Sequence, residues 1–159
     1  MIKIVRADLT KPQHAEDLIS LMSEYASDPM GGGRDLSNYV KCHLAAALNA
    51  RNDTNVILAY DEDEAVGLIT CIEGFSTFAC KPLLNIHDAI VKSEYRGQGI
   101  IKKLLREGEV IANEMGCCKM TLEVLEGNKA AQLAYTKYGF SSYRLDPDIG
   151  QALFWEKQL

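Results

Sequence analysis

The feature that most constrains the fold is a strand that leads through a glycine turn into an amphipathic helix. The apolar run Leu84–Val91 predicts the strand, and Arg96-Gly97-Gln98-Gly99 forms the turn. The apolar stripe of the helix consists of Ile101, Leu104, Leu105, Gly108, Ile111, Ala112 and Met115. Gly116 ends the helix, and the alternation over Lys119–Val124 predicts the next strand. A strand, a helix and a strand in this order predict a parallel strand pair joined by a crossover helix.

Shorter periodic segments predict the remaining helices and strands. The predicted helices are Pro12–Ser27, a second helix that Asp35 or Ser37 caps and that ends near Asn49, and a short helix that Asn128 caps and that ends near Tyr138. The other predicted strands are Ile2–Arg6, Asn55–Tyr60, Ala65–Phe78, Phe140–Leu145 and Ala152–Leu159. The predicted order β-α-α-β-β-β-α-β-α-β-β indicates an α/β fold with one mixed, mostly antiparallel sheet flanked by helices. The length of 159 residues fits a single domain over residues 1–159.

Charge and composition exclude several classes of function. The net charge of −5, without a basic stripe, argues against a protein that binds nucleic acid through phosphate contacts. No apolar run approaches the ~18 residues of a membrane span, and the N-terminal strand lacks the apolar core of a signal peptide. The five cysteines are odd in number and lack the spacing of a metal site, which favours reduced thiols in a cytoplasm. We therefore expect a cytoplasmic globular protein without a nucleic-acid partner, a membrane span or a metal.

The glycine turn has the features of an anion site. Gly97 and Gly99 carry no side chains, so the backbone can approach a ligand closely. The helix that follows presents free N–H groups and the positive end of its dipole at the same point. Arg96, Lys102 and Lys103 add positive charge that suits a pyrophosphate. The sequence therefore predicts a phosphorylated ligand at this turn.

Two of the known phosphate-binding turns do not fit these residues. A Rossmann turn requires a glycine or alanine three residues beyond Gly99, where this chain has Lys102. A P-loop requires Gly-Lys-Ser/Thr at the start of the helix, and Ile101-Lys102-Lys103-Leu104 supplies no hydroxyl for magnesium. Both turns lack residues that their chemistry requires.

A third type of turn fits. The segment Val91–Ile100 resembles the acetyl-CoA pyrophosphate loop of the GCN5-related N-acetyltransferase (GNAT) superfamily, whose signature is Arg/Gln-x-x-Gly-x-Gly/Ala. A second segment, Glu126–Phe140, resembles the family pattern in which an Asn is followed seven residues later by Tyr and then by Gly-Phe. The element order and the length also agree, so the resemblance covers nearly the whole chain. The chain departs from the signature at Ile101, whose side chain we expect to turn inward onto the apolar stripe of the helix.

The resemblance implies direct transfer of an acetyl group from acetyl-CoA to an amine, without an acyl-enzyme. It implies that backbone groups of Ala89, Ile90 and Val91 bind the pantetheine arm and the oxyanion, because this strand diverges from the next. It also implies a contact between Asn128 and the pantetheine arm, beside the role of this residue as a helix N-cap. The remaining residues expected to bind the cofactor are Arg96, Gly97, Gln98, Gly99, Ile100, Ile101, Lys102 and Tyr135.

Three residues are candidates for proton transfer or substrate contact. Tyr135 matches the family tyrosine beside the cofactor sulfur and is expected to protonate the departing thiolate, although its helical spacing also suits a core residue. Strand alternation places Asn85, His87 and Val91 on one face of the sheet and Asp88 on the other. His87 is the candidate base, since an imidazole pKa of about 6.5 suits proton abstraction. Asp88 occupies a typical acidic position of the family and is expected to orient a neighbour or contact the substrate.

The acceptor is less constrained than the cofactor. The acidic charge balance favours a small cationic amine, while an amino sugar, an amino acid or a protein lysine stays open. The glycine loop Met30–Gly33 and its acidic neighbours lie where the first two helices of the family cover the acceptor, so they either select the amine or serve only as a connector. Many members of the family dimerise, which leaves a homodimer open. A rival hypothesis, motivated by Ile101 and the uncertain base, is a CoA-binding sensor or regulatory module that has lost catalytic activity.

Overall fold

The computed structural model describes residues 1–143, 146, 148, 150 and 152–159. Contacts within the chain divide it into two compact units, Met1–Leu122 and Glu123–Leu159. The first unit contains three α-helices and the whole sheet that the described residues form. The predicted single domain over residues 1–159 stays a prediction.

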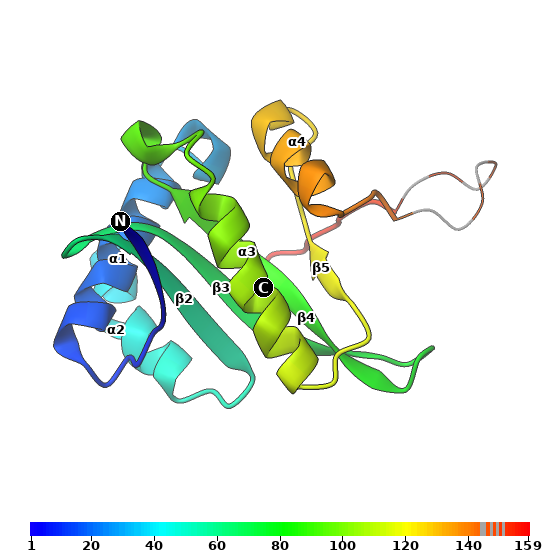
Figure 1. The fold of residues 1–159 in the computed structure, drawn as a ribbon, viewed down its shortest axis with the longest axis horizontal. Helices are drawn as coiled ribbons and strands as arrows, with labels where there is room; N and C mark the ends of the chain where they lie inside the picture. Colours follow the sequence, from blue (N-terminus) through cyan, green and yellow to red (C-terminus); the bar gives the residue numbers. More distant parts are fainter. Residues whose placement is uncertain (144–145, 147, 149, 151) are drawn as a thin grey trace. The chain divides into compact units, whose positions relative to one another are not determined.

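The first unit is built on a five-stranded sheet whose strands follow their order in the chain (Figure 1). The strands are β1 (Ile2–Arg6), β2 (Thr54–Asp61), β3 (Glu64–Ser76), β4 (Lys81–Val91) and β5 (Met120–Leu122). β1 to β4 pair with their neighbours in antiparallel orientation, and β4 pairs with β5 in parallel. The predicted mixed, mostly antiparallel sheet is therefore confirmed, as is the parallel pair joined by a helix.

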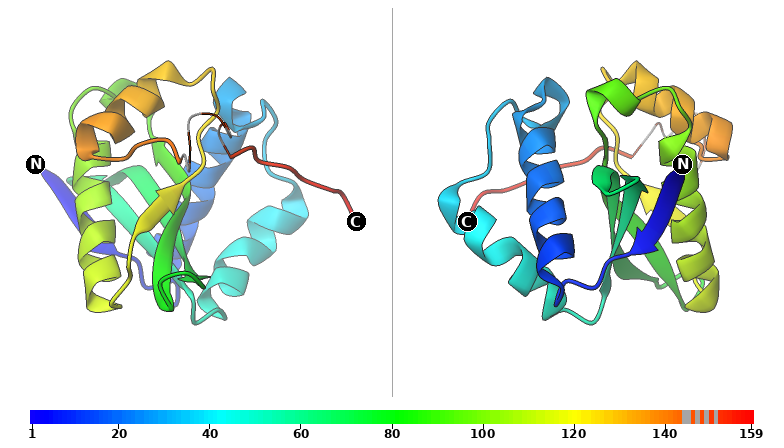
Figure 2. Two further views of the ribbon diagram at one scale, coloured as in Figure 1. Left: turned by 90° about the vertical axis from the view of Figure 1, so that its right-hand side faces the viewer. Right: turned by 60° about the vertical axis from the view of Figure 1, so that its left-hand side comes forward.

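Helices cover both faces of this sheet (Figure 2). They are α1 (Pro12–Ser27), α2 (Asn38–Asn49) and α3 (Ile100–Glu114), together with the short 3-10 helices η1 (Pro29–Gly31) and η2 (Ser93–Tyr95). Leu18 of α1 is fully buried in one cluster with Leu68 and Ile90 of the sheet. Gly108 of α3 lies against Ile69 instead. Leu68 and Ile69 are neighbours on β3 whose side chains point to opposite faces, so α1 and α3 enclose the sheet between them.

Local sequence signals explain where the helices begin and end. Pro12 occupies the first turn of α1, where its missing N–H costs no hydrogen bond. The Ser37 side chain accepts a hydrogen bond from the Val40 N–H at 3.3 Å, so Ser37 rather than Asp35 caps α2. Gly116 adopts a φ of +69° directly after the C-cap residue of α3, a conformation that favours glycine. The predicted limits of these three helices are therefore confirmed.

The buried face of α3 differs by one residue from the predicted stripe. Ile100 is 1% exposed, whereas Ile101 is only half-buried. Ile100, Leu104, Gly108 and Ala112 follow one another at intervals of four residues, so they form one row along the helix. Ile100, which the predicted stripe did not include, therefore holds the first inward position, and Ile101 lies half-buried four residues before the buried Leu105.

The described part of the second unit contains one helix, α4 (Lys129–Tyr138). The Asn128 side chain accepts a hydrogen bond from the Ala131 N–H at 3.1 Å and so caps this helix as predicted. Residues 140–143 and 152–159 form no strand, which corrects the predicted final strand pair for the described residues. Residues 144 and 145 of that prediction lie outside the described part of the chain. Alternating side chains do not make a strand by themselves, because the backbone groups also need a partner.

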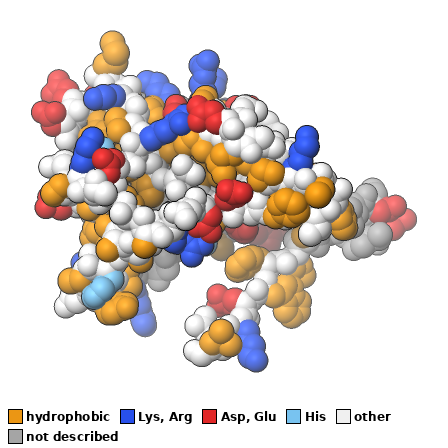
Figure 3. Space-filling view, turned by 90° about the horizontal axis from the view of Figure 1, so that it is seen from below, with side chains coloured by type: hydrophobic (Ala, Val, Ile, Leu, Met, Phe, Trp, Pro, Cys, Tyr) orange, Lys and Arg blue, Asp and Glu red, His pale blue; other side chains and the backbone are white. Residues whose placement is uncertain are grey.

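None of the described helices combines the length and apolar character that crossing a membrane requires. On the face drawn in Figure 3, lysine and arginine side chains lie apart from one another among acidic and apolar ones. The coloured part of this face therefore carries no continuous basic stripe of the kind that follows a nucleic-acid backbone.

Gly67 allows the N-terminal end of α3 to pack directly on the sheet. It lies opposite Val91, the last residue of β4. A β-carbon on Gly67 would lie 3.0 Å from the carbonyl oxygen of Ile90 and 3.4 Å from side-chain atoms of Ile100 and Leu104. The absent side chain therefore brings the start of α3 close to the end of β4.

We expect Gly67→Ala to destabilise the protein by about 1–3 kcal/mol, because the added methyl group forces β4 or the start of α3 to move. Gly74→Ala on the same strand is the control, since a β-carbon there would meet only the side chain of Leu83. We expect this control to change the free energy of unfolding by less than about 1 kcal/mol. Chemical denaturation measures both variants, and equal losses would contradict the role given to Gly67.

Candidate functional site

The carboxyl-terminal half of β4 has an edge that β5 leaves unpaired. β5 pairs with β4 only over Leu84, Asn85 and Ile86, although β4 continues to Val91. The predicted divergence of these two strands is therefore confirmed. It leaves the residues of β4 from position 87 onward without a partner on this side within the first unit.

Hydrogen bonding to β3 decides which backbone groups face the unpaired edge. The Lys92 N–H donates to the Val66 carbonyl at 3.0 Å, and in an antiparallel pair every second residue points the same way. The backbone groups of Ile90 therefore face β3, whereas those of Ala89 and Val91 face the unpaired edge. Of the three backbone positions predicted to bind a ligand, two therefore have their backbone groups turned towards the unpaired edge.

A β-bulge interrupts the pairing of β3 with β4. Asp88 lies opposite Thr70, but Ile86 lies opposite Cys71. His87 is therefore an extra residue without a counterpart on β3. Its side chain is exposed, whereas the carboxyl group of Asp88 lies largely within the protein.

The bulge changes which residues share a face. Asn85, Asp88 and Ile90 lie opposite even-numbered residues of β3 and share the face that α1 covers. Val91 lies on the opposite face, so the predicted separation of Asp88 from Val91 is confirmed. The predicted grouping of Asn85 with Val91 is wrong, and His87 falls outside the alternation. Periodicity does not reveal such a bulge, because one extra residue shifts the alternation without any change in composition.

Asp88 brings a carboxyl group into the layer between the sheet and α1. Burial raises the pKa of this carboxyl group, and the charge of His87 and the nearby Thr70 hydroxyl oppose that shift. The Thr70 oxygen is buried beside Asp88 and makes no well-formed hydrogen bond with any described residue. On α1, burial and the charges of Asp88 and Asp28 raise the pKa of the Tyr25 phenol. The Tyr25 phenol therefore lies within electrostatic reach of both carboxyl groups.

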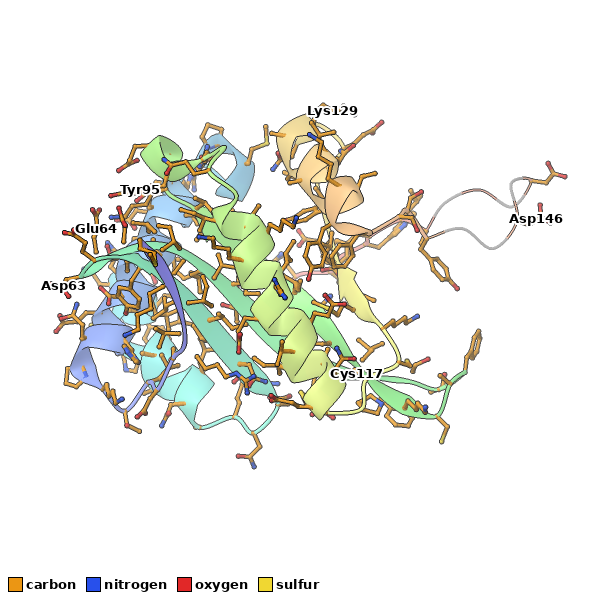
Figure 4. All side chains as sticks on the ribbon, viewed as in Figure 1. Asp63, Glu64, Tyr95, Cys117, Lys129 and Asp146 are labelled. Carbon is orange, nitrogen blue, oxygen red and sulfur yellow. The ribbon has the colours of Figure 1, made fainter. Side chains whose placement is uncertain are left out.

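The loop after β4 is held by side-chain contacts at its start. Lys92 Nζ lies 2.7 Å from Oε1 of Glu64, and the Tyr95 hydroxyl donates to Oε2 of the same carboxylate at 3.0 Å. Figure 4 shows Glu64 and Tyr95 together at the end of the sheet from which the loop departs. The Gln98 side chain donates to the Glu94 carbonyl at 3.2 Å. These contacts fix the loop on the β2–β3 hairpin and leave its backbone to form the turn.

Gly97 and Gly99 give the turn its backbone conformation. Their φ angles are +78° and +77°, in the left-handed region that favours glycine. A β-carbon at either position would meet nothing within 4 Å, so the space around the turn is open. Gly99 is also the N-cap of α3, and the N–H groups of the first helical turn have no partner within the helix. The turn thus has the geometry that an anion site requires.

Arg96, a predicted phosphate ligand, has protein partners on two sides. Its Nε donates to the Val91 carbonyl at 3.0 Å, and its Nη2 forms an ion pair with Oδ2 of Asp28 at 3.0 Å. The backbone N–H of Met30 and the Arg96 guanidinium both lower the pKa of Asp28. No local pattern predicts this contact, because 68 residues of the chain separate Asp28 from Arg96. Lys102 is exposed at the start of α3 and has the charge for a phosphate contact.

In the second unit, Tyr135 lies partly buried on α4. Its ring packs edge-on against Phe140, with centroids 6.1 Å apart, and the ring of Tyr138 lies at the same distance from Phe140. Both tyrosines therefore make packing contacts of the kind that their helical spacing also allowed. The acid role of Tyr135 and the ligand contact of Asn128 stay predictions.

No group of three histidine, cysteine or carboxylate side chains in the described part of the chain is arranged to hold a metal ion. All five cysteines are free thiols. Burial, together with the charge of Asp88, raises the pKa of the Cys71 thiol to about 12. Cys71 is therefore a neutral, packed thiol at physiological pH.

Comparison with known proteins agrees with this geometry. The sequence model of the acetyltransferase (GNAT) family matches residues 18–140. Thialysine N-epsilon-acetyltransferase of Bos taurus is 41% identical over 56 residues, which make up 35% of this chain and 33% of that protein. The chain spans between 33% and 57% of the length of the curated relatives that it matches.

Solved structures show the same fold over the whole chain. An aminoglycoside acetyltransferase from an uncultured soil metagenomic sample, in complex with trehalose, has a TM-score of 0.81 and 22% identity. That alignment covers 99% of this chain and 96% of the other. AAC(6')-Iy in complex with the bisubstrate analogue CoA-S-monomethyl-acetylneamine has a TM-score of 0.78 and 14% identity, over 100% of this chain and 99% of the other. At these identities the likeness concerns the fold.

The buried position of Asp88 predicts that its charge lowers stability at neutral pH. Its pKa is higher in the folded protein than in the unfolded chain, so the unfolded state binds fewer protons between these two values, and stability falls as the pH rises through them. We expect Asp88→Asn to raise Tm at pH 7 and this gain to shrink as the pH falls towards the ordinary carboxyl pKa of about 4. Thermal unfolding measured across this pH range checks the expectation.

Asp28→Asn is the contrasting variant. Hydrogen bonds from Met30 and Arg96 lower the pKa of Asp28, so its charged form stabilises the fold above the unfolded pKa and that contribution is lost in acid. We expect this variant to have a lower Tm than the parent protein at pH 7 and a similar Tm at low pH. A lower Tm for Asp88→Asn at pH 7 would contradict the burial argument.

Proposed function

The chain belongs to the acetyltransferase (GNAT) family, and on this basis we propose that it transfers the acetyl group of acetyl-CoA directly to a primary amine. The observation that carries the proposal is the unpaired edge of β4 beside the glycine turn at the start of α3. Only Lys92 and the short helix η2 separate Val91 from the turn, so edge and turn belong to one stretch of backbone. That stretch offers donors both to a thioester carbonyl and to a pyrophosphate.

Successive residues of this stretch are assigned to successive parts of acetyl-CoA. The pantetheine arm and the thioester oxygen, on which negative charge develops during transfer, are assigned to the backbone groups of Ala89 and Val91. The pyrophosphate is assigned to the backbone N–H groups of Gly97, Gln98, Gly99, Ile100, Ile101 and Lys102. The open space around the two glycines supports this fit. Ile101 departs from the family signature, but its N–H still lies in the first turn of α3, so the departure removes no donor.

Asp88 is the residue that we expect to receive the proton of the attacking amine. Its buried carboxyl group has a raised pKa, which brings its basicity closer to what proton transfer near neutral pH requires. Asp88 lies on the face of the sheet that α1 covers, and Tyr25 is part of α1. This assignment therefore has the amine approach from that face. His87, the base expected from the sequence, is exposed on the bulge, and its charge lowers the pKa of Asp88. We therefore give His87 the role of adjusting the basicity of Asp88.

The proton that the departing thiolate needs is assigned to Tyr135. This assignment rests on the match of the segment Glu126–Phe140 to the family pattern. Protonation or a strong hydrogen bond stabilises a thiolate leaving group, and a phenol hydroxyl can donate either. Tyr138, three residues later on α4, has no such match and is treated as a packing residue.

A small cationic amine is the proposed acceptor. The carboxyl groups of Asp28 and Asp88 near Tyr25 favour a positively charged substrate on the α1 face. Two proteins similar to this chain are named for amino compounds, as an aminoglycoside acetyltransferase and a thialysine N-epsilon-acetyltransferase. The proposed class therefore includes amino sugars and amines at the end of a side chain, and a protein lysine belongs to the same chemistry.

The compartment and the assembly are proposals of the same kind. The free thiols of all five cysteines support a reducing compartment, and we propose the cytoplasm. A homodimer, as found in many members of the family, stays a prediction.

A second candidate function is a CoA-binding sensor without catalysis. The observation that favours it is Ile101, which stands in the turn where the family signature has a small residue.

An assay of thiol release separates the two candidate functions. Purified protein is given acetyl-CoA and a panel of amines that includes aminoglycosides, diamines, thialysine, free lysine and a lysine peptide. We expect free CoA thiol to accumulate with at least one small cationic amine and mass spectrometry to find the acetylated product. Saturable binding of acetyl-CoA without thiol release across the panel would favour the sensor instead.

We expect Tyr135→Phe to reduce turnover by roughly 10- to 10⁴-fold, because it removes the donor for the leaving thiolate. The affinity for acetyl-CoA should change little, since the ring itself is retained. Tyr138→Phe on the same helix is the control and should keep its turnover. Steady-state kinetics with the best amine measures both variants, and unchanged turnover in Tyr135→Phe would remove this residue from the mechanism.

A further inference from the structure

An ion pair joins the loop after α1 to the loop after β4. Asp28 follows the last residue of α1, and Arg96 opens the glycine turn. Oδ2 of Asp28 lies 3.0 Å from Nη2 of Arg96, and the two side chains are 23% and 54% exposed. We propose that this ion pair, named the Asp28–Arg96 tether, holds the loop Ser27–Gly33 in the position that the acceptor amine requires. This inference rests on the proposed function and assigns Asp28 as a positioning residue.

Asp28 organises its own loop, so fixing this residue fixes the loop. Its carboxyl Oδ1 accepts a hydrogen bond from the Met30 N–H at 2.8 Å. Its backbone carbonyl accepts two more, from the Gly31 N–H at 2.8 Å and from the Gly33 N–H at 3.1 Å. Gly31 is also packed so closely on the Tyr25 carbonyl that no β-carbon fits there. The loop therefore moves as one piece with Asp28.

Arg96 is a firm anchor for this loop. Its Nε donates to the Val91 carbonyl at 3.0 Å, on the edge of β4 that β5 leaves unpaired. The preceding residues of its loop are held on Glu64 by Lys92 and Tyr95. The guanidinium thus connects the sheet on one side with the carboxylate of Asp28 on the other.

The tether bears on the acceptor through Tyr25. This residue contacts the loop at Gly31, and the charges of Asp28 and Asp88 both act on its phenol. Asp88 is the residue proposed to receive the proton of the amine. Loss of the tether releases the loop that packs on Tyr25, whereas the backbone donors of the glycine turn stay in place.

The tether also redefines what Arg96 does in the glycine turn. A direct contact with the pyrophosphate requires the guanidinium to leave both Val91 and Asp28. The backbone N–H groups at the start of α3, with Lys102 and Lys103, provide positive potential without that rearrangement. The geometry therefore assigns Arg96 to the acceptor loop, and a role as phosphate ligand is the competing outcome of the experiment.

A double-mutant cycle on Asp28→Asn and Arg96→Gln isolates the tether. Asparagine keeps an oxygen for the Met30 N–H and loses only the charge that faces Arg96. The matched controls are Asp53→Asn and Arg51→Gln. Arg51 and Asp53 form another Asp–Arg ion pair, with two hydrogen bonds of 2.9 and 2.6 Å, in the connection from α2 to β2. That connection precedes Thr54, which pairs with Ile72 at the far end of β3 from Gly67 and Val91.

Three measurements are made on each variant. Amide hydrogen exchange reports on residues 30–33, calorimetry gives the Kd for CoA, and steady-state kinetics separates KM for the amine from kcat. We expect each single variant to speed exchange in the loop by about 10-fold and to raise the amine KM by about 3- to 10-fold. We expect the Kd for CoA and kcat to stay within about 2-fold. The double variant should match the single variants, Arg96→Lys should recover part of the loss, and both controls should resemble the parent protein.

Three results would overturn the tether. The first is additive effects of the two substitutions, and the second is loop exchange that neither substitution alters. The third is a Kd for CoA that rises about 10-fold in Arg96→Gln but not in Asp28→Asn, which would make Arg96 a phosphate ligand. Hydrogen exchange does not depend on catalysis, so a protein that transfers no acetyl group but shows coupled loop exchange keeps the tether and loses the proposed function. Intact acetyl transfer with unchanged loop exchange would keep the proposed function and overturn the tether.

Discussion

The antiparallel ladder between β3 and β4 is the interaction on which the rest of the first unit depends. It runs from Ser76 and Lys81 at the hairpin to Gly67 and Val91 at the opposite end. α1 packs on one of its faces and α3 on the other, so both helices take their positions from this pair of strands. Because β4 is satisfied along β3, its other edge can lose β5 after Ile86 without leaving the strand unsupported. A strand that is firm on one side and unpaired on the other is suited to receive a ligand by hydrogen bonds from its backbone.

The chemistry proposed for Asp88 and its cost to the fold have the same origin. A carboxyl group in the layer beneath α1 loses hydration, which raises its pKa and weakens the folded state when it is charged. The buried Thr70 oxygen beside it makes no well-formed hydrogen bond with any described residue. A buried polar group in this condition often marks a site where function has been favoured over stability.

The sequence predicted most of the fold and the backbone of the candidate site, but it did not predict the contacts that connect distant segments. Helix limits followed from local signals such as Ser37 and Gly116, and the glycine turn followed from residue types within a short segment. The bulge at His87 was not predictable, because it is defined by the register of two strands rather than by either sequence. The ion pair of Asp28 with Arg96 depends on the packing of α1 against the sheet, which no local pattern encodes. The family resemblance placed Asp88 in the site, and the register then showed which face it occupies.

The bulge has one more consequence, for the behaviour of the protein at high concentration. A long, regular strand edge invites another chain to add a strand to it, and aggregation through sheet edges begins in this way. Within the first unit, β5 covers three residues of the β4 edge, and the bulge at His87 follows directly after them. The extra residue disturbs the spacing of donors and acceptors that an added strand would have to match. One irregularity therefore keeps the edge accessible to a small ligand while making it a poor template for another polypeptide.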